Sequence, residues 1–353
     1  MARSAESEIL VSAMGWWLLD EGRRFMGDAL GQLVDSQWTM PAVPTIRQST
    51  FSLMDFGGGA DRVLLVVPAP IKRPYIWDLA PRVSVVRTAM KAGWRIFLVD
   101  WARDLPADIG LEQMVSRIIE AATHVVHQTT RTPIIAGHSL GGTLTALAVA
   151  SDPAVAAGVI LIESPTGFGA RAGAFAPQVA KIQDAAEITA LLGGVPGSFL
   201  NRVSAQADHH AFVNQPYWDW VACLADPDAM QLHLKVRRWS LDEVPLPAQL
   251  FEDVVELLYR RDLFMRGRLR LFGALLNPAL PHPVMTIFDP RSRVVPPSSV
   301  LPLHDKARHP LTQRQEWGWE PGTLLHHLAP LVGRDAHATL WPRILGWGVA
   351  AGA

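Results

Sequence analysis

Short, continuous apolar runs recur along the chain and alternate with segments of helical periodicity. The runs occupy residues 62–67, 96–99, 133–136, 159–162 and 283–288. A strand that is apolar at every position is buried on both faces, as in a parallel sheet covered by helices. Residues 111–128 repeat apolar side chains every three or four positions, which indicates a helix. The pattern predicts an α/β fold, with a mostly parallel sheet and helices on both faces.

The two ends and the middle of the chain differ from this alternation. Residues 7–35 have helical spacing, and Pro41 and Pro44 then mark a linker. Residues 166–275 mix glycine, proline, aromatic residues and helical pieces, including 247–261, and we interpret them as a cap inserted over the sheet. Such a cap would lie at the carboxyl ends of the strands, where ligands bind in open α/β sheets. A weaker strand is expected near 311–317 and a closing helix over 340–349.

These patterns divide the chain into four parts. The expected division is an N-terminal helical extension (1–50), the first part of the core (51–165), the cap (166–275) and the second part of the core (276–353).

Composition excludes several classes of protein. The net charge is −1 over 353 residues, so no charge excess favours a nucleic-acid partner. Cys223 is the only cysteine, which rules out an intramolecular disulfide. The first ten residues include acidic side chains where a signal peptide is apolar, and no long uncharged apolar run suggests a transmembrane span. We therefore expect a cytoplasmic protein, and the sequence leaves a homodimer open.

The sequence Gly137-His138-Ser139-Leu140-Gly141 carries the first chemical signal. It reads G-x-S-x-G between an apolar run and an Ala/Leu-rich helical segment. A strand, a sharp turn centred on serine and a helix form a nucleophile elbow, which exposes the hydroxyl beside the free N–H groups of the helix start. Ser139 is therefore the candidate nucleophile. The alternative interpretation is a glycine-rich helix start with a capping serine.

Several longer blocks stand out between about Val63 and Trp347. They are VVPAPIKRPYIWDLAP, FLVDW, the elbow, IESPTGFG, RRWSLDEVPLP, LFEDVVELLYRRDLFMRGRLRLFG, PVMTIFDPRSRVVP and LWPRILGW. Together these blocks resemble the polyhydroxyalkanoate synthase branch of the α/β-hydrolase fold. The elbow is common to the whole superfamily, whereas the first block and LLYRRDLFMRG are more specific to this branch. The resemblance implies an α/β-hydrolase fold with an inserted cap.

The resemblance also implies acyl transfer through a covalent acyl-enzyme, from a coenzyme A thioester or a polyester chain. Family members carry cysteine in the elbow, where this chain has Ser139. A serine needs full general-base assistance and more often passes its acyl group to water. We therefore expect an ester or thioester hydrolase acting on hydroxyacyl or other acyl substrates, without a metal or prosthetic group. The alternatives are a synthase or acyltransferase that uses hydroxyacyl-coenzyme A, and a weakly active or inactive binding relative.

A serine nucleophile needs a base, which in this fold lies late in the chain. His326, His327 and His337 are the candidates. The segment HLAPLVGRDAHATLWP resembles the family's run between its catalytic histidine and the final LWP, which favours His327 as the base. His326 would then point elsewhere, and His337 has the alternative role of a packing or surface residue.

The acid that orients the base is less clearly marked. The resemblance places the family's aspartate at Ser292, and a serine cannot supply the negative charge. Asp289 follows the predicted strand directly and is the favoured acid, with a turn-capping role as its alternative. Glu163, at the end of the preceding apolar run, is the second candidate. A dyad without an acid remains the third option.

The oxyanion hole needs two backbone N–H groups. One is expected from Leu140, directly after the nucleophile. The resemblance aligns the second with Pro70, which has no N–H, so we expect Ile71 to donate instead.

Three further groups carry weaker signals. Asp208-His209-His210 is interpreted as a solvated part of the cap rather than a metal site. Tyr217, Trp218 and Trp220 either line an acyl pocket or pack within the cap. The third group is a run of arginines, interpreted as a solvated face with coenzyme A phosphates as the alternative ligand: Arg260, Arg261, Arg266, Arg268 and Arg270.

Overall fold

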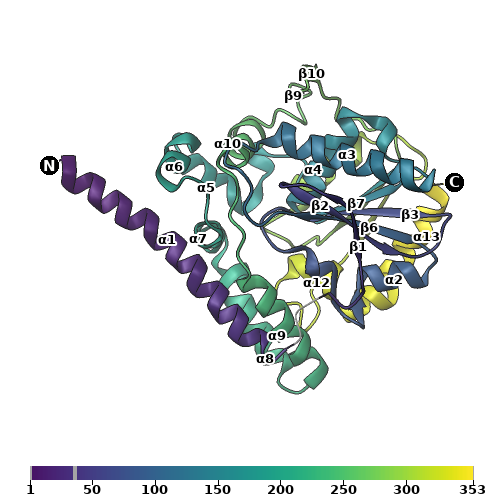
Figure 1. Cartoon of the computed structure of the whole chain (residues 1–353), viewed down its shortest axis with the longest axis horizontal. Coiled ribbons are helices and arrows are strands. Elements are labelled where there is room, and N and C mark those ends of the chain that lie inside the picture. Colours follow the sequence, from purple (N-terminus) through teal and green to yellow (C-terminus); the bar gives the residue numbers. More distant parts are fainter. Residues whose placement is uncertain (1, 35–37, 353) are drawn as a thin grey trace.

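An eight-stranded sheet forms the centre of the protein (Figure 1). The computed structural model describes residues 2–34 and 38–352, with the side chains of the first helix described from residue 13. The strand order is β1-β2-β6-β3-β7-β8-β11-β12. The bounds are β1 Val43–Arg47, β2 Phe51–Gly57, β3 Val63–Val67, β6 Arg95–Trp101, β7 Ile134–His138, β8 Gly158–Ile162, β11 Val284–Phe288 and β12 Gln313–Glu316.

From β6 to β12 all neighbouring strands pair in parallel, while β1 and β2 add an antiparallel edge. Every residue of β3, β7, β8 and β11 is buried. The apolar runs in the sequence therefore mark central strands, and the expected α/β fold is confirmed. The weaker strand expected near 311–317 is present as the polar edge strand β12.

Helices cover both faces of the sheet (Figure 1). One face packs against α3 (Leu111–Thr129), α4 (Leu140–Ser151) and α11 (Pro297–Lys306). The other packs against α2 (Val85–Lys91) and the C-terminal α13 (Trp341–Ala351). The remaining core elements are short: η1 Pro74–Trp77, β4 Asp78–Ala80, β5 Val83–Ser84, η2 Pro153–Val155, η7 His326–Leu328, α12 Ala329–Val332 and η8 Ala336–Leu340.

Between β8 and β11 the chain forms a helical layer beside the carboxyl ends of the strands (Figure 1). We call this layer the cap. Its elements are η3 Gly169–Arg171, η4 Gly173–Phe175, α5 Ala176–Lys181, α6 Ala185–Leu192, α7 Gly197–Ala207, η5 His210–Asn214, α8 Gln215–Cys223, α9 Pro227–Leu241, α10 Ala248–Asp253, η6 Val254–Arg260, β9 Arg270–Leu271 and β10 Ala274–Leu275. The single helix predicted over 247–261 is thus α10 continued by the π-helical η6.

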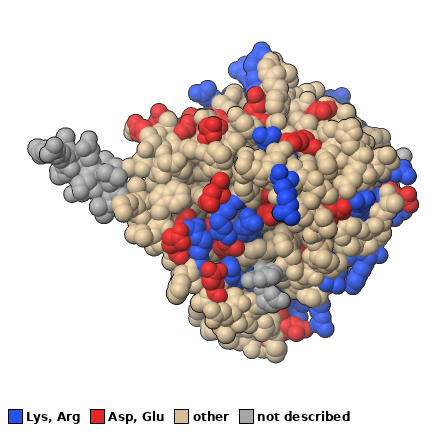
Figure 2. Space-filling view, viewed as in Figure 1, with Lys and Arg blue, Asp and Glu red and all other residues tan. Residues whose placement is uncertain are grey.

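The N-terminal helix α1 (Ala2–Gly31) packs along the cap, mainly against α9 (Figure 1). The helix ends at Gly31, whereas the sequence predicted an end at residue 35, which lies outside the described residues. The side chains of Ile9 and Leu10, two apolar positions of the predicted helix, also lie outside the described residues. Within the residues that the structure describes, no helix has the length and hydropathy of a transmembrane span. On the face shown in Figure 2, acidic and basic side chains are interspersed.

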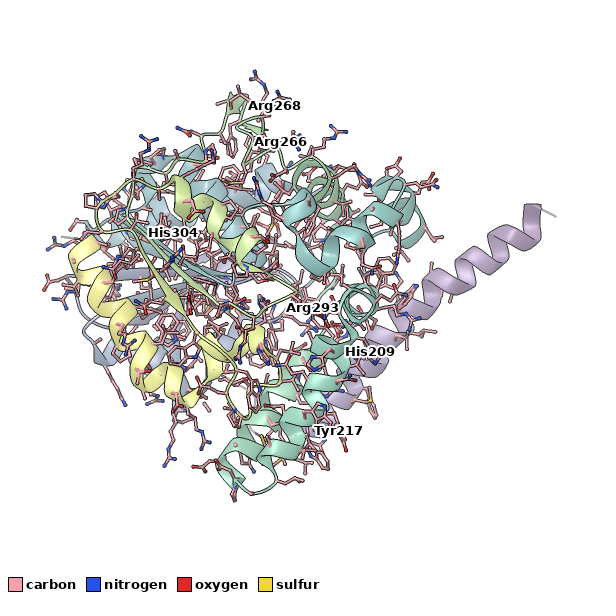
Figure 3. All side chains as sticks on the ribbon, turned by 180° about the vertical axis from the view of Figure 1, so that it is seen from behind. His209, Tyr217, Arg266, Arg268, Arg293 and His304 are labelled. Carbon is pink, nitrogen blue, oxygen red and sulfur yellow. The ribbon has the colours of Figure 1, made fainter. Side chains whose placement is uncertain are left out.

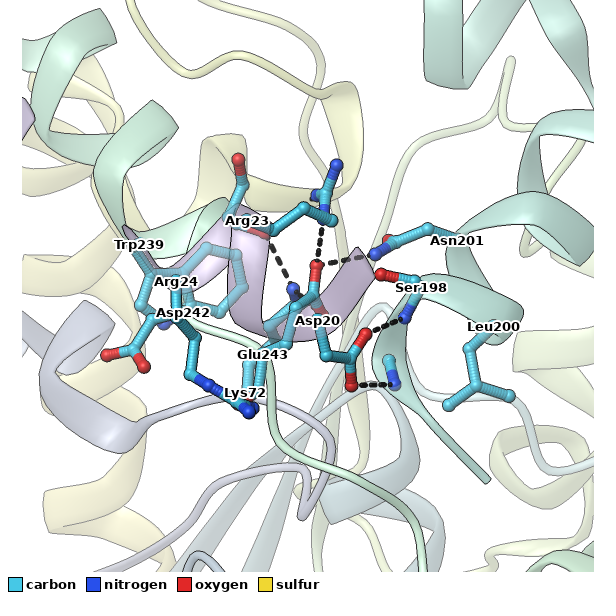
Figure 4. A network of polar contacts seen from close by, with 12 residues as sticks. Asp20, Arg23, Arg24, Lys72, Ser198, Leu200, Asn201, Trp239, Asp242 and Glu243 are labelled. Atoms are coloured by element: carbon cyan, nitrogen blue, oxygen red, sulfur yellow. Dashed lines mark hydrogen bonds and ion pairs between the residues drawn. The ribbon is translucent and has the colours of Figure 1, made fainter. Parts of the chain in front are cut away.

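A buried ion cluster fixes α1 to the cap and the core (Figure 4). The fully buried carboxylate of Glu243 accepts hydrogen bonds from Arg23, Lys72 and Asn201, each at 2.6 Å. Asp20 of α1, also buried, accepts the N–H groups of residues 197 and 198 at 2.9 and 2.7 Å. These contacts join four segments that are distant in sequence.

The start of the core differs from the sequence expectation. Pro41 and Pro44 were expected in a linker, yet Pro44 lies in β1, so the sheet begins before residue 51. Proline is tolerated there because β1 is an edge strand, where a missing N–H costs no central ladder bond.

Candidate active site

Ser139 lies in a strained turn between β7 and α4. Its backbone has φ 55° and ψ −131°, a conformation that side chains rarely adopt. The turn is possible because Gly142 lacks a side chain: a Cβ there would lie 1.9 Å from Ser164 Oγ. Strain of this kind is typical of functional sites, and it gives Ser139 the geometry of a nucleophile elbow.

A cavity of about 900 Å³ opens over Ser139 between the core and the cap. Ser139, His138 and His327 line it, together with the loop after β3, including Ile71. The cap contributes a mainly apolar wall made of Leu200, Phe212, Val213, Tyr217 and Trp220. Basic side chains also face the cavity, namely Arg23, Lys72, Arg73, Arg202 and Arg237.

The two neighbouring histidines of η7 contact different carboxylates. His326 Nδ1 donates to Asp289 Oδ2 at 2.8 Å. His327 Nδ1 lies 3.5 Å from Glu163 Oε2. His327 Nδ1 and Glu163 Oε2 are both buried, and neither has another hydrogen-bond partner among the described residues. The structure therefore places Glu163, rather than the expected Asp289, against His327.

The local backbone explains this exchange of partners. Glu163 directly follows β8 and adopts φ 47°, a left-handed conformation. Its Oε1 accepts the Asp289 N–H at 2.5 Å, which fixes the carboxylate between the ends of β8 and β11. Asp289 instead accepts its hydrogen bonds from His326 and from the N–H of Arg291. Ser292, at the position of the family's aspartate, caps the turn by accepting the Val295 N–H.

Burial shapes the electrostatics of the His327–Glu163 pair. Burial lowers the pKa of His327 to about 4, so the imidazole is neutral at neutral pH. Burial also raises the pKa of Glu163 well above its ordinary value. For Asp289, burial raises the pKa, but hydrogen bonds from His326 and Arg291 outweigh it and leave the pKa lowered. A neutral imidazole is the state that a general base requires, and His327 lines the same cavity as Ser139.

His138, inside the G-x-S-x-G sequence, adds a contact that the sequence analysis missed. Its Nε2 donates to the backbone oxygen of His327 at 2.9 Å, and the two rings lie 4.4 Å apart. His138 thereby fixes the turn that carries the candidate base. Only the elbow pattern itself pointed to this position.

The other candidate base, His337, is part of the core packing. It is buried, donates from Nε2 to Leu331 O at 2.8 Å and contacts Thr88 through Nδ1. This is the packing role weighed as its alternative.

The expected oxyanion donors lie next to Ser139 in the chain or line the same cavity. Leu140 begins α4 directly after Ser139, and Ile71 lines the same cavity. The loop after β3 approaches the elbow closely: a Cβ on Gly141 would lie 2.8 Å from Ala69 N. Ala69, which has an N–H and lines the cavity, is thus a further candidate donor that the sequence analysis did not consider.

The three groups of residues with weaker sequence signals lie in different parts of the structure. Tyr217 and Trp220 line the cavity, so part of the aromatic group faces the candidate site. Arg266 and Arg268 lie by the β9–β10 hairpin, at the opposite end of the molecule from Tyr217 (Figure 3). His209 and His210 are exposed, and Asp208 accepts the N–H of residue 211.

One group among the described residues has donor atoms close enough to hold a metal ion: Asp219, Cys223 and His233. Both carboxylate oxygens of Asp219 already accept hydrogen bonds, among them one from His233 Nδ1 at 2.6 Å. Burial raises the pKa of Cys223 to about 11, so its thiol stays protonated. A protonated thiol and a saturated carboxylate are poor metal ligands, and this geometry favours a hydrogen-bonded cluster instead.

Comparisons with known proteins relate the sequence to polymerase subunits and the fold to solved structures of hydrolases. No family model matches the chain. The chain is 23% identical over 301 residues to the poly(3-hydroxyalkanoate) polymerase subunit PhaC of Haloferax mediterranei, covering 81% of this chain and 58% of that protein. It is 24% identical to the PhaC subunit of Allochromatium vinosum, over 80% of this chain and 79% of that protein.

Solved structures show the same fold in hydrolases. The Paleococcus ferrophilus monoacylglycerol lipase superposes with a TM-score of 0.55 and 14% identity, covering 85% of this chain and 99% of that one. A Thermogutta terrifontis esterase superposes with a TM-score of 0.54 and 16% identity, covering 89% and 100%. The resemblance read from the sequence is confirmed: the chain is similar in sequence to PhaC polymerase subunits and has the fold of these hydrolases.

Proposed function

We propose that this chain is an acyltransferase in which Ser139 is the nucleophile, His327 the general base and Glu163 the acid that orients the base. One observation carries this assignment. Ser139 and His327 line the same cavity, while Nδ1 of His327 lies beside a buried Glu163 oxygen that has no other partner among the described residues. Their separation of 3.5 Å fits a resting state, since catalytic hydrogen bonds often tighten only when substrate binds.

The proposed substrate is a hydroxyacyl-coenzyme A thioester, and the proposed product is a polyester. The similarity to two PhaC polymerase subunits supports this choice over the hydrolase expected from the serine alone. The cavity offers an apolar wall for an acyl chain and basic side chains, such as Arg202 and Arg237, for phosphates.

The proposed steps use only groups in the cavity. His327 Nε2 takes the proton of Ser139 Oγ, and Oγ attacks the thioester carbonyl. The C–S bond then breaks, and the leaving thiolate takes the proton from His327, which leaves an acyl ester on Ser139. The hydroxyl of a second hydroxyacyl group next gives its proton to His327 and attacks the ester. Ser139 Oγ leaves with that proton, and the chain has grown by one unit.

Backbone N–H groups would stabilise the negative oxygen of each tetrahedral intermediate. Leu140 at the start of α4 is the first proposed donor and Ile71 the second, with Ala69 as an alternative to Ile71. The N-terminal end of α4 adds favourable electrostatics at the same point.

Hydrolysis is the second candidate, and the serine at position 139 favours it. Water in place of the acceptor hydroxyl would release a free hydroxy acid by the same steps. An alkoxide leaves less readily than a thiolate, so acyl groups on a serine pass less easily along a growing chain.

Incubation with 3-hydroxybutyryl-coenzyme A distinguishes these candidates. Formation of insoluble polyester together with free coenzyme A supports the synthase, whereas free 3-hydroxybutyrate alone supports the hydrolase. A fluorophosphonate probe provides the test of the nucleophile. Absence of labelling at Ser139 in folded protein would contradict both enzymatic proposals.

A further inference from the structure

Asp219 of the cap contacts the segment that leads to the candidate base. This residue lies on α8 and is fully buried. Its Oδ1 accepts Trp319 Nε1 at 3.1 Å and the Gly322 N–H at 2.9 Å. Its Oδ2 accepts the Leu324 N–H at 3.0 Å. Three donors within six residues of the core thus converge on one carboxylate of the cap.

Two of these donors are N–H groups of residues with an unusual backbone conformation. Gly322 has φ 90° and Leu324 has φ 65°, so both lie in the left-handed region. For leucine this conformation is strained and persists only where the surroundings enforce it. Leu324 precedes His326 and His327 by two and three residues, so the direction of its backbone affects where both imidazoles lie.

The fourth donor links the same carboxylate to the cavity. His233 of α9 lines the cavity and donates from Nδ1 to Asp219 Oδ2 at 2.6 Å. Asp219 therefore bonds to two elements of the site: a cavity-lining side chain of the cap and the backbone that carries the base.

We propose that Asp219 is a positioning residue for His327, holding the left-handed turn at residues 322–324 and thereby making the cap part of the catalytic geometry. The proposal rests on the proposed function, because it assigns importance to His327 as the base. It also makes productive placement of His327 depend on where α8 docks. A cap displaced from the core would release the Gly322 and Leu324 N–H groups and leave the base without a fixed position.

The test replaces Asp219 with asparagine. In D219N the amide nitrogen would face either Leu324 N–H and His233 Nδ1–H or the other two donors, so donors would oppose donors. A displacement of the base by about 1 Å is expected to slow acylation of Ser139 about 100-fold. The readouts are the rate of fluorophosphonate labelling across pH, and kcat and KM for 3-hydroxybutyryl-coenzyme A.

Asp78 provides the matched control. It is also fully buried and accepts four hydrogen bonds, from Thr39 N and Oγ1, Met40 N and Ser84 Oγ. None of these donors belongs to the loop of the candidate base. D78N should lower Tm at least as much as D219N yet retain the wild-type labelling rate and kcat in the folded protein.

A second variant tests the backbone explanation. Leu324→Gly removes the strain of the left-handed conformation, since glycine adopts positive φ freely. Leu324 is also buried and lines the cavity, so this substitution removes apolar contacts as well as strain. The loss of kcat that it causes should therefore be smaller in the D219N background than in the wild type, because the strain no longer opposes the turn there. If D219N does not fold, Trp319→Phe removes a single donor and should give a smaller loss of kcat in the same direction.

Two kinetic results would overturn the proposal. One is wild-type kcat and an unchanged pH profile in D219N, or in W319F where D219N does not fold. The other is an equal loss of kcat in D78N. Amide hydrogen exchange of residues 319–328 separates this proposal from the proposed function. If wild-type Ser139 is not labelled, the proposed function fails, whereas unchanged exchange in D219N shows that Asp219 does not hold the turn.

Discussion

At the scale of single residues, the two imidazole–carboxylate pairs have unequal expected roles. Glu163 faces His327, which lines the cavity, while Asp289 holds its neighbour His326. We expect Glu163→Gln to lower kcat by about 10³-fold or more, because a base that loses its orienting carboxylate takes the wrong tautomer. Asp289→Asn should cost about tenfold or less, through the packing of the same turn.

Turnover of 3-hydroxybutyryl-coenzyme A by both folded variants checks this ordering. Circular dichroism provides the control, because the Asp289 N–H bond to Glu163 involves the backbone and survives in D289N. A larger loss of kcat in D289N than in E163Q would identify Asp289 as the acid that orients the base, as the sequence suggested.

The buried environment of His327 predicts an unusual pH dependence. Its pKa is lowered to about 4 by burial, from an ordinary value of 6.5. A general base acts in its deprotonated form, so activity is lost as pH falls through this pKa. Burial raises the pKa of Glu163, so its carboxyl also titrates on the way down from neutral pH, and the test therefore uses E163Q, in which this group is absent. In E163Q, labelling of Ser139 by a fluorophosphonate should stay level from neutral pH down to about 5 and halve only near 4. A midpoint near 6.5 in folded E163Q would contradict the buried position of His327.

At the scale of elements, the elbow depends on the close approach of β7, α4 and the residues after β8. Gly142→Ala would place a Cβ 1.9 Å from Ser164 Oγ, which the packed interior cannot absorb without a backbone shift. We expect loss of Ser139 labelling and destabilisation by about 1–3 kcal/mol, as for overpacking of a core.

Gly346→Ala is the control for this substitution. Gly346 lies in α13, and no atom lies within 4 Å of the point that a Cβ would occupy there. Alanine at this position should leave labelling intact and stabilise the helix by up to about 1 kcal/mol. Urea unfolding of both variants measures the difference. Equal stability of the two variants would show that the elbow tolerates side chains.

The central strands and the elbow were predictable from sequence because their signals are local. Continuous apolar runs mark β3, β7, β8 and β11, which are buried along their whole length. The antiparallel edge was missed for a physical reason: β1 contains Pro44 and is partly exposed, so its sequence looks like a linker.

The partners of the two histidines were not predictable, since they depend on side-chain directions at the ends of two strands. Asp289 and Glu163 both follow apolar runs, and both were candidates for the acid. Which one meets His327 is decided by the left-handed backbone of Glu163 and by the turn that delivers η7. The contact of Asp219 with residues 319–324 is equally non-local, because it joins positions about 100 residues apart.

At the scale of the whole molecule, Glu243 joins α1, the loop after β3 and the cap. Its fully buried carboxylate pairs with both Arg23 and Lys72 (Figure 4). Glu243→Gln leaves both cations without this partner, and breaking a buried pair in this way costs about 3–5 kcal/mol. We therefore expect a lower urea midpoint and, because Arg23 and Lys72 line the cavity, weaker substrate binding.

Arg82→Gln is the control for that prediction. Arg82 pairs with Asp228 on the surface at 2.9 Å, and exposed pairs contribute little to stability. Its urea midpoint should equal that of the wild type. A midpoint for E243Q that also equals the wild-type value would show that the cluster does not stabilise the assembly of α1, cap and core.

The fate of the acyl group also belongs to the whole molecule, because elbow, cap and cavity together decide whether water or a hydroxyl reaches the acyl-enzyme. Ser139→Cys replaces the proposed nucleophile, which is also the leaving group of the transfer step, and alters no other side chain. A thiolate accepts and releases acyl groups more readily than an alkoxide, so the ratio of polyester to free acid should rise about twofold or more. Quantifying both products from 3-hydroxybutyryl-coenzyme A measures this ratio, and Ser139→Ala should yield neither. A falling ratio in S139C would mean that the cavity, and not the nucleophile, controls the competition between transfer and hydrolysis.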